Sequence, residues 1–416
     1  MMIALALLVA VGLLTLVHWY VWRRVVRDVS APRSAWRRTG TALAVVLPLL
    51  SLGALAGGRA LPIAAERWLA WPGYLWLAVL LYLVLGLLVG EAVRPLLLRA
   101  RRGSVPQPER EPVPAGAVGA EPSGGDARPG GAAAGDRPGP ADPSRRLLVA
   151  RGVAIAAGGA AAAVVGNGAY GVLRGPRLKQ VTVPLAKLPR QAHGYRIAVV
   201  SDIHLGPILG RAHTQRIVDT INSAQPDLIT VVGDLVDGSV ADLGPAAEPL
   251  ARLRARDGAY FVTGNHEYFS GAAEWVDFVR DLGVHPLENA RTELPHFDLA
   301  GVNDIAGTAE GQGPDYGRAL GDRDRTRAAV LMAHQPVAVH EAVRRGVDLQ
   351  LSGHTHGGQL WPGNYLAELA NPTVAGLERY GDTQLYVTRG AGAWGPPVRV
   401  GAPSDITIVT LASLRA

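Results

Sequence analysis

One local pattern occurs five times in the C-terminal half of this chain and limits what it can fold into. A short, apolar, largely β-branched run is followed at once by a polar or glycine-containing turn. The five runs are Ile197–Val200, Leu228–Val232, Tyr260–Val262, Ala328–Met332 and Leu349–Leu351. Continuous apolar runs of this length are typical of strands that are buried on both faces of a sheet.

Helix-like stretches lie between several of these runs. They are His213–Ser223, Glu274–Leu282 and Val337–Arg345, and Pro336 stands at a suitable first helical position for the last of them. Strands that alternate with helices indicate an α/β sheet, in which functional loops gather at the carboxyl ends of the strands. We therefore expect turns that are distant in sequence to meet at one site.

These turns carry the residue types of a metal centre. Of the eleven histidines in the chain, five lie in them: His204, His266, His334, His354 and His356. Asp202, Asp234 and Asn265 add carboxylate and amide oxygens. This set suits Mn, Fe, Co or Zn, and the chain has no cysteine to favour softer ions. A carboxylate between two ions about 3.5–4 Å apart would hold a hydroxide that attacks phosphorus in line.

A resemblance to the calcineurin-like metallophosphoesterase superfamily rests on five fragments. They are Asp202-Ile203-His204, Gly233-Asp234, Gly264-Asn265-His266-Glu267, Ala333-His334-Gln335-Pro336 and Gly353-His354-Thr355-His356-Gly357-Gly358-Gln359. The last fragment and Thr388-Arg389-Gly390-Ala391-Gly392 are similar to the membrane-associated bacterial phosphodiesterase branch. The resemblance covers about residues 180–416 and implies an α/β fold with a two-sheet sandwich flanked by helices.

The resemblance also implies a role for each polar residue. Asp202, His204 and His356 hold one divalent ion. Asn265, His334 and His354 hold the second ion, and Asp234 bridges the two. His266 lies outside the ions, where it stabilises the transition state or protonates the leaving oxygen. Glu267 stands where many members have Asp, at a position that is not a ligand.

Four further polar residues are open to two interpretations each. Asn303-Asp304 follows the strand-like run Phe297–Val302 and either reaches the site or forms a turn. Arg389 and Arg399 either contact phosphate or serve as structural arginines.

The first 180 residues are of a different kind. Met1–Trp22, Thr41–Leu61 and Trp71–Gly90 are apolar, and each has the roughly 20 residues that cross a bilayer. They predict a transmembrane region of three helices over residues 1–100. Residues 101–146 are rich in Pro, Gly and Ala and predict a disordered linker. Residues 147–173 form a fourth apolar stretch, so three or four transmembrane helices precede the domain at 180–416.

Arginine placement orients these segments. Arginines are dense after the first and third apolar segments and sparse between the second and third, which places the dense loops in the cytoplasm. A fourth crossing then puts residues 180–416 outside. Ser144-Arg145-Arg146 resembles a twin-arginine export signal placed inside the chain. The alternative is that the two arginines only flank a membrane helix on its positive side.

The charge of the chain is divided between its two parts. Residues 1–178 carry a balance of +11 and residues 179–416 a balance of −5. The basic character therefore follows membrane topology, and no nucleic acid is expected as a partner. The expected partners are the lipid bilayer and a phosphate ester, drawn from an envelope lipid or polymer.

The sequence thus predicts a multi-pass protein of the cell membrane with an extracytoplasmic, metal-dependent phosphoesterase domain. Phosphodiesters are the expected substrates, and two divalent ions are the expected cofactors. Two other readings stay open at this point. One is a metal-binding sensor or scaffold domain without activity, as on a transporter or receptor. The other is an intracellular nuclease, if the topology is inverted.

Overall fold

The computed structural model describes residues 2–57, 61–100 and 143–415. The chain divides into two compact units, one made of residues 1–41 and 84–158 and the other of residues 42–83 and 159–416. A disordered linker was expected at residues 101–146, of which residues 101–142 lie outside the described residues, so their disorder stays a prediction. For residues 143–146 the prediction is wrong, because they form the start of helix α4.

Long helices make up the N-terminal part: α1 (Met2–Val21), α2 (Ala35–Gly57), α3 (Ile63–Ala100) and α4 (Pro143–Leu173). Among the described residues, three segments are long and apolar enough to cross a membrane: Ala35–Gly57, Ile63–Leu98 and Arg145–Leu173. The first expected crossing, Met1–Trp22, falls on α1, whose side chains lie partly outside the described residues, and it stays a prediction. Because α4 begins at Pro143, it includes the two arginines that the sequence placed before the helix.

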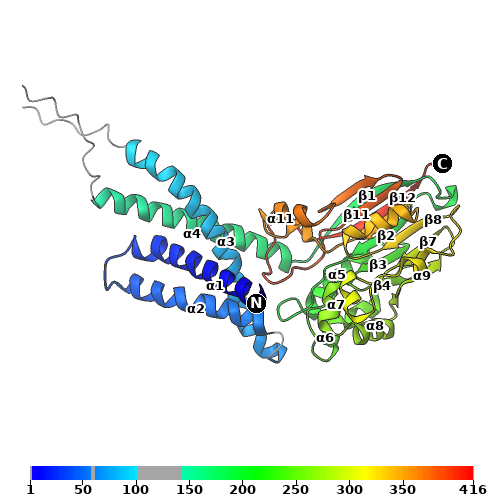
Figure 1. The fold of residues 1–416 in the computed structure, drawn as a ribbon, viewed down its shortest axis with the longest axis horizontal. Helices are drawn as coiled ribbons and strands as arrows, with labels where there is room; N and C mark the ends of the chain where they lie inside the picture. The colour runs from blue at the N-terminus through cyan, green and yellow to red at the C-terminus, as the bar shows by residue number, and fades with distance from the viewer. Residues whose placement is uncertain (1, 58–60, 101–142, 416) are drawn as a thin grey trace, which may run out of the picture. The chain divides into compact units, whose positions relative to one another are not determined.

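Two six-stranded sheets form the C-terminal part (Figure 1). In order, the first contains β1 (Arg177–Leu185), β12 (Asp405–Ser413), β2 (Tyr195–Val200), β3 (Leu228–Val232), β4 (Ala259–Val262) and β5 (His285–Pro286). The second contains β10 (Gly376–Tyr380), β11 (Thr383–Val387), β9 (Leu349–Ser352), β8 (Ala328–Met332), β7 (Phe297–Gly301) and β6 (Ala290–Glu293). All five apolar runs of the repeated pattern are strands, so the α/β expectation is confirmed. The first strand starts at Arg177, slightly before the expected domain start at 180.

One apolar core lies between the sheets. Ile197 and Val199 of β2 belong to the same buried cluster as Phe297 of β7 and Leu349 of β9. Residues of both sheets therefore share one interior, as expected of a sandwich.

Helices cover the outer faces of both sheets. On the first sheet these are α5 (Arg211–Ser223), α6 (Val240–Ala247) and α8 (Ala272–Asp281), packed through Ile217, Leu243 and Trp275. On the second they are α9 (Tyr316–Leu320) and α10 (Val339–Arg344). The three helices expected from the sequence correspond to α5, α8 and α10. A short 3₁₀ turn that begins at Pro336 precedes α10.

Strand register brings the ligand-bearing turns to one edge. Strands β2, β3 and β4 are parallel, with Ile197 paired to Leu228 and Ile229 to Ala259. Strands β8 and β9 of the second sheet are also parallel, and Val330 is paired to Leu349. Within each sheet, the carboxyl ends of neighbouring parallel strands therefore lie at the same edge, and the turns that follow them meet there.

Candidate metal centre

The structure brings together all eight residues that the sequence singled out. Asp202 follows β2, Asp234 follows β3, and Asn265 begins α7 (Asn265–Ser270) just after β4. His334 follows β8, and the pair His354 and His356 follows β9. The buried members are Asp202, His204, Asp234, His334 and His356, and the half-buried members are Asn265, His266 and His354.

A first ligand group contains Asp202, His204 and His356, whose donor atoms all lie within 4.8 Å of one another. The Nε2 atoms of His204 and His356 are 3.0 Å apart. Nε2 of His356 also lies 3.4 Å from Oδ1 of Asp202. Two imidazole nitrogens and a carboxylate oxygen therefore converge on one point, which is the arrangement that a divalent ion needs.

A second ligand group contains Asp234, His334 and His354. Nε2 of His334 lies 3.1 Å from Oδ2 of Asp234. Nδ1 of His334 lies 2.8 Å from the carbonyl of Val232, to which it donates when it carries the proton, and this leaves Nε2 free for an ion. Nδ1 of His354 lies 3.0 Å from the amide oxygen of Asn265, so Asn265 belongs to this group as well.

Asp234 lies between the two groups. Its Oδ2 atom is 3.1 Å from Nε2 of His334 and 3.8 Å from Nε2 of His204. Its Oδ1 atom accepts a hydrogen bond from the backbone N–H of His266 at 2.9 Å. A carboxylate within reach of both imidazoles has the position that a bridging ligand requires.

Backbone strain is concentrated at these positions. Asp202, His204, Asp234, His354 and His356 all have φ between 48° and 72°. This left-handed region is uncommon for residues other than glycine, and each instance costs of order 1–3 kcal/mol. Gly353 allows the close packing around them, because a Cβ there would overlap Ser201 Oγ and the Asp202 carboxylate. Such strain is typical of functional sites that the surrounding fold holds in place.

Asp237 is a functional residue that the sequence reasoning missed. Its Oδ1 atom lies 2.9 Å from Nδ1 of His204 and 2.7 Å from Nδ1 of His266. One carboxylate therefore orients a candidate ligand and the candidate catalytic histidine at the same time. Although burial opposes it, His204 and His266 hold the pKa of Asp237 below its usual value. In the sequence, the one sign of this role was that Asp237 lies three residues after Asp234 in the same turn.

Glu267 and Arg399 support the ligand loops from behind. The buried carboxylate of Glu267 accepts hydrogen bonds from the backbone N–H groups of Asp234, Leu235 and Gly264. It ties the β3 turn to the β4 turn and stays outside the ligand groups, as expected. The buried guanidinium of Arg399 lies 3.0 Å from both Nδ1 and the carbonyl oxygen of His356. Arg399 therefore has the structural role, one of its two expected alternatives.

Among the described residues, no hydrogen bond or ion pair joins Asn303, Asp304 or Arg389 to the ligand side chains. The side chain of Asp304 caps a 3₁₀ turn by accepting from the N–H of Ala306, and Asn303 donates to the carbonyl of Gln312. The turn interpretation of this pair therefore holds. Arg389 lies 3.9 Å from Asp405 and remains one-third exposed.

The electrostatics of the site favour bound cations. Although burial lowers it, the carboxylates of Asp237 and Asp234 raise the pKa of His204 to about 9. The pKa of His334 is also raised, because the carboxylate of Asp234 outweighs the effect of burial. Burial and the charge of His334 lower the pKa of His354 to about 4. The negative potential that retains protons on His204 and His334 would equally stabilise divalent ions in their place.

The donor set fits such ions. Nε2 of His334 is buried and points at Oδ2 of Asp234, 3.1 Å away, where an ion can bind through its lone pair. Imidazole, carboxylate and amide oxygen together suit the divalent ions of the first transition row and zinc. The site therefore has the chemistry to hold such a metal in each ligand group.

The comparisons with known proteins cover the part of the chain that contains the site. The sequence pattern of calcineurin-like phosphoesterases matches residues 195–358, a range that includes both ligand groups. A transmembrane protein with a metallophosphoesterase domain from Danio rerio is 40% identical over 250 residues, which are 57% of this chain and 57% of that protein. The chain therefore matches little more than half the length of that relative.

Two shorter bacterial relatives are matched over nearly their whole length. A metallophosphoesterase of Aquifex aeolicus is 34% identical over 56% of this chain and 91% of its own length. A metallophosphoesterase of Bacillus subtilis is 31% identical over 61% of this chain and 93% of its own length. Both are named as uncharacterised. The similarity thus extends to animals as well as bacteria.

Proposed function

The chain belongs to the calcineurin-like phosphoesterase family, and on this premise we propose that it is a membrane-anchored, metal-dependent phosphodiesterase. The observation that supports this function best is the pair of ligand groups with Asp234 between them. One group is Asp202, His204 and His356, and the other is Asn265, His334 and His354, the division that the family resemblance implies.

Two divalent ions of Mn, Fe, Zn or Co, when bound, would activate a water molecule and neutralise charge on the phosphoryl oxygens. The protein supplies their ligands on turns with strained backbones, so the ligands are fixed before the substrate arrives. Asp234, held by the N–H of His266, would supply negative charge to an ion in either ligand group.

His266 is proposed as the group that protonates the leaving oxygen. Its ring stands edge-on to His204, with 4.7 Å between the ring centroids, so it lies next to the first ligand group. Its Nδ1 atom faces Asp237 at 2.7 Å, which leaves Nε2 free to face the substrate. The Asp237 carboxylate orients the ring, as a positioned general acid requires.

The proposed topology places four membrane crossings before a catalytic domain outside the cytoplasm. Within the first unit, the α1–α2 segment contacts the end of α3 and the start of α4. Arg24 lies 3.0 Å from Glu91 of α3, and Nε of Arg151 in α4 donates to the carbonyl of Val29 at 3.0 Å. These arginine-rich ends therefore lie on one side, as the positive-inside rule expects of the cytoplasmic face.

The test of this function uses the purified full chain in detergent and two chromogenic aryl phosphates, one a diester and one a monoester. We expect hydrolysis of the diester with added Mn, loss of turnover on chelation, and recovery when the metal is restored. A fully metallated protein that is inactive on both esters would favour the scaffold reading. Hydrolysis of the monoester alone would retain the metal chemistry and reject the diester preference.

A further inference from the structure

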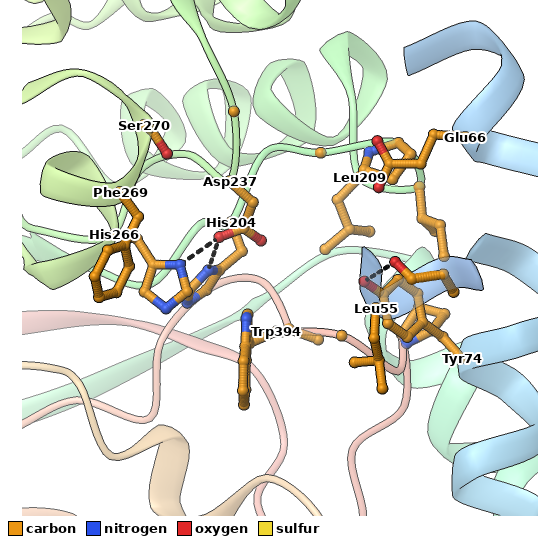
Figure 2. A pocket seen from close by; sticks show the side chains of 18 of the residues that line it. Leu55, Glu66, Tyr74, His204, Leu209, Asp237, His266, Phe269, Ser270 and Trp394 are labelled. Atoms are coloured by element: carbon orange, nitrogen blue, oxygen red, sulfur yellow. Dashed lines mark hydrogen bonds and ion pairs between the residues drawn. The ribbon is translucent and has the colours of Figure 1, made fainter. Parts of the chain in front are cut away.

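A pocket of about 400 Å³ opens beside His204 and His266 (Figure 2). On one side it is lined by the loops of the metal centre, including Asp237, Phe269 and Trp394. On the other side it is lined by Ala54, Leu55, Glu66 and Tyr74 of α2 and α3. All of these residues belong to the second compact unit. The volume is within the range of sites that hold small molecules or part of a larger ligand.

The wall of this pocket next to the reactive histidine is aromatic. The rings of Phe269 and Trp394 each lie 5.8 Å from the ring of His266, between centroids. Phe269 is 70% exposed and Trp394 is 56% exposed. Leu55 is also exposed and faces them from the helix side (Figure 2). A cluster of exposed apolar groups around a catalytic site indicates a substrate that has an apolar part.

The helix side of the pocket lies at the ends of two membrane-length helices. Leu55 is near the end of α2, which finishes at Gly57, and Glu66 is in the first turn of α3. The hydroxyl of Tyr74 donates to the carbonyl of Ala54 at 3.0 Å, which fixes this pair of helices beside the pocket. Helix α3 has 38 residues, more than the roughly 20 that cross a bilayer, so its first turns can project from the bilayer on the water side. The pocket then lies next to the membrane, where the head group of a lipid can reach it.

Helix α11 (Gly363–Ala370) is the second observation, and it is independent of the pocket. None of its residues is buried, and Leu366 and Leu369 are 71% and 85% exposed. Trp361, just before it, is half exposed, and its carbonyl accepts a hydrogen bond from the hydroxyl of Tyr82 in α3 at 2.9 Å. An exposed apolar helix tied to a membrane-length helix suits the lipid interface, where aromatic and apolar side chains gather.

We propose, building on the phosphodiesterase function above, that the substrate is a membrane lipid with a phosphodiester in its head group. The phosphate lies at the ligand groups, the apolar part lies along Leu55, Phe269 and Trp394, and α11 rests in the lipid surface. In the reaction, a water oxygen forms a bond to phosphorus and the bond from phosphorus to the leaving alcohol oxygen breaks. His266 delivers a proton to that leaving oxygen, and the attacking water gives up one proton to the solvent, so the products are a phosphomonoester and an alcohol.

The experiment compares two substrates that differ only in their apolar part. Both are the same chromogenic aryl phosphodiester, one with a methyl group and one with a hexadecyl chain. The full chain is placed in phosphatidylcholine nanodiscs, into which the hexadecyl substrate partitions. We expect kcat/KM for the hexadecyl ester to be at least tenfold higher. Equal values, or a preference for the methyl ester, would overturn the lipid proposal while the phosphodiesterase function stands. Hydrolysis of neither ester would instead reject the function on which the proposal rests.

A pair of variants tests the role of α11. Leu366→Ser combined with Leu369→Ser should lower the hexadecyl-to-methyl ratio of kcat/KM several-fold, because the helix then leaves the lipid surface. Val343→Ser is the matched control, since Val343 is an apolar residue of α10 that is 40% exposed and does not line the pocket. The control should keep the wild-type ratio. An unchanged ratio in the double variant, or an equal fall in the control, would reject α11 as the lipid contact.

Discussion

Individual side chains have different roles at this site. Asp234 faces both ligand groups, whereas Asp237 faces one ligand and the candidate acid, His266. The two aspartates lie in the same turn but serve different functions, because only Asp234 lies among the donor atoms of the second group. Substitutions at Asp234 and His266 should therefore affect metal binding and catalysis separately.

The variant His266→Ala should keep both metals and lose rate by about 10²–10⁴, the usual contribution of a general acid. The rate is measured by turnover of the aryl diester, and metal content by elemental analysis. His340→Ala, at an exposed histidine of α10, is the control and should change neither quantity. A metal-depleted His266→Ala protein, or one with the wild-type rate, would show that the assigned role is wrong.

The variant Asp234→Asn should lose metal as well as activity. The amide keeps the size of the side chain but removes the negative charge that both ligand groups share. We expect a metal content well below that of wild type and an activity that excess Mn restores only in part. Full occupancy of both sites in this variant would argue against a bridging carboxylate.

At the scale of the element, α5 contains a buried histidine that the catalytic site does not use. His213 is 1% exposed, and neither of its ring nitrogens has a hydrogen-bond partner among the described residues. Burial, and then the charges of Arg216 and Arg399, lower its pKa to about 4. The unfolded chain has a histidine pKa of about 6.5, so it binds the proton first as the pH falls.

Acid should therefore destabilise the protein through this helix. Between pH 7 and pH 4.5, protonation of the unfolded state removes about 2 kcal/mol of stability, and the loss begins near pH 6.5. The variant His213→Leu lacks this loss, so its melting temperature should fall by about 5 °C less than that of wild type over the same interval. The measurement is thermal unfolding in detergent at both pH values. An identical acid shift in the two proteins would exclude His213 as the cause.

At the scale of the whole molecule, the question is on which side of the membrane the catalytic domain lies. Helix α4 ends at Leu173 and β1 begins at Arg177, so the domain follows the last apolar helix directly. Arg145 and Arg146 lie inside α4 at its start, and their positive charge alone would orient the helix.

Replacement of both arginines by lysine keeps the charge and removes only the twin-arginine pair. We expect the domain to remain accessible to protease added to intact spheroplasts of a bacterial host, in the variant as in the wild type. Loss of accessibility in the variant would favour the export signal. A domain that is protected even in the wild type would contradict the proposed topology.

The sequence by itself determined the strands that lead into the ligand-bearing turns, the α/β class and the set of polar residues that come together. It did so because each apolar run and its turn are adjacent in the chain, so the pattern is local. The assignment of Asn265, His334 and His354 to one ligand group and of Asp202, His204 and His356 to the other did not come from local patterns. It followed from the family resemblance.

Only the tertiary structure decided which atoms meet. His204 and His356 are 152 residues apart in sequence, and their Nε2 atoms come within 3.0 Å because parallel strands of two sheets end at one edge. The position of Asp237 three residues after Asp234 only weakly indicated a place in the site. Its role in orienting His266 depends on the fold, because His266 lies on another turn. Arg399 was settled as a structural residue by its contact with His356. The pocket shared with α2 and α3 likewise depends on contacts between distant segments, which local patterns in a single sequence do not encode.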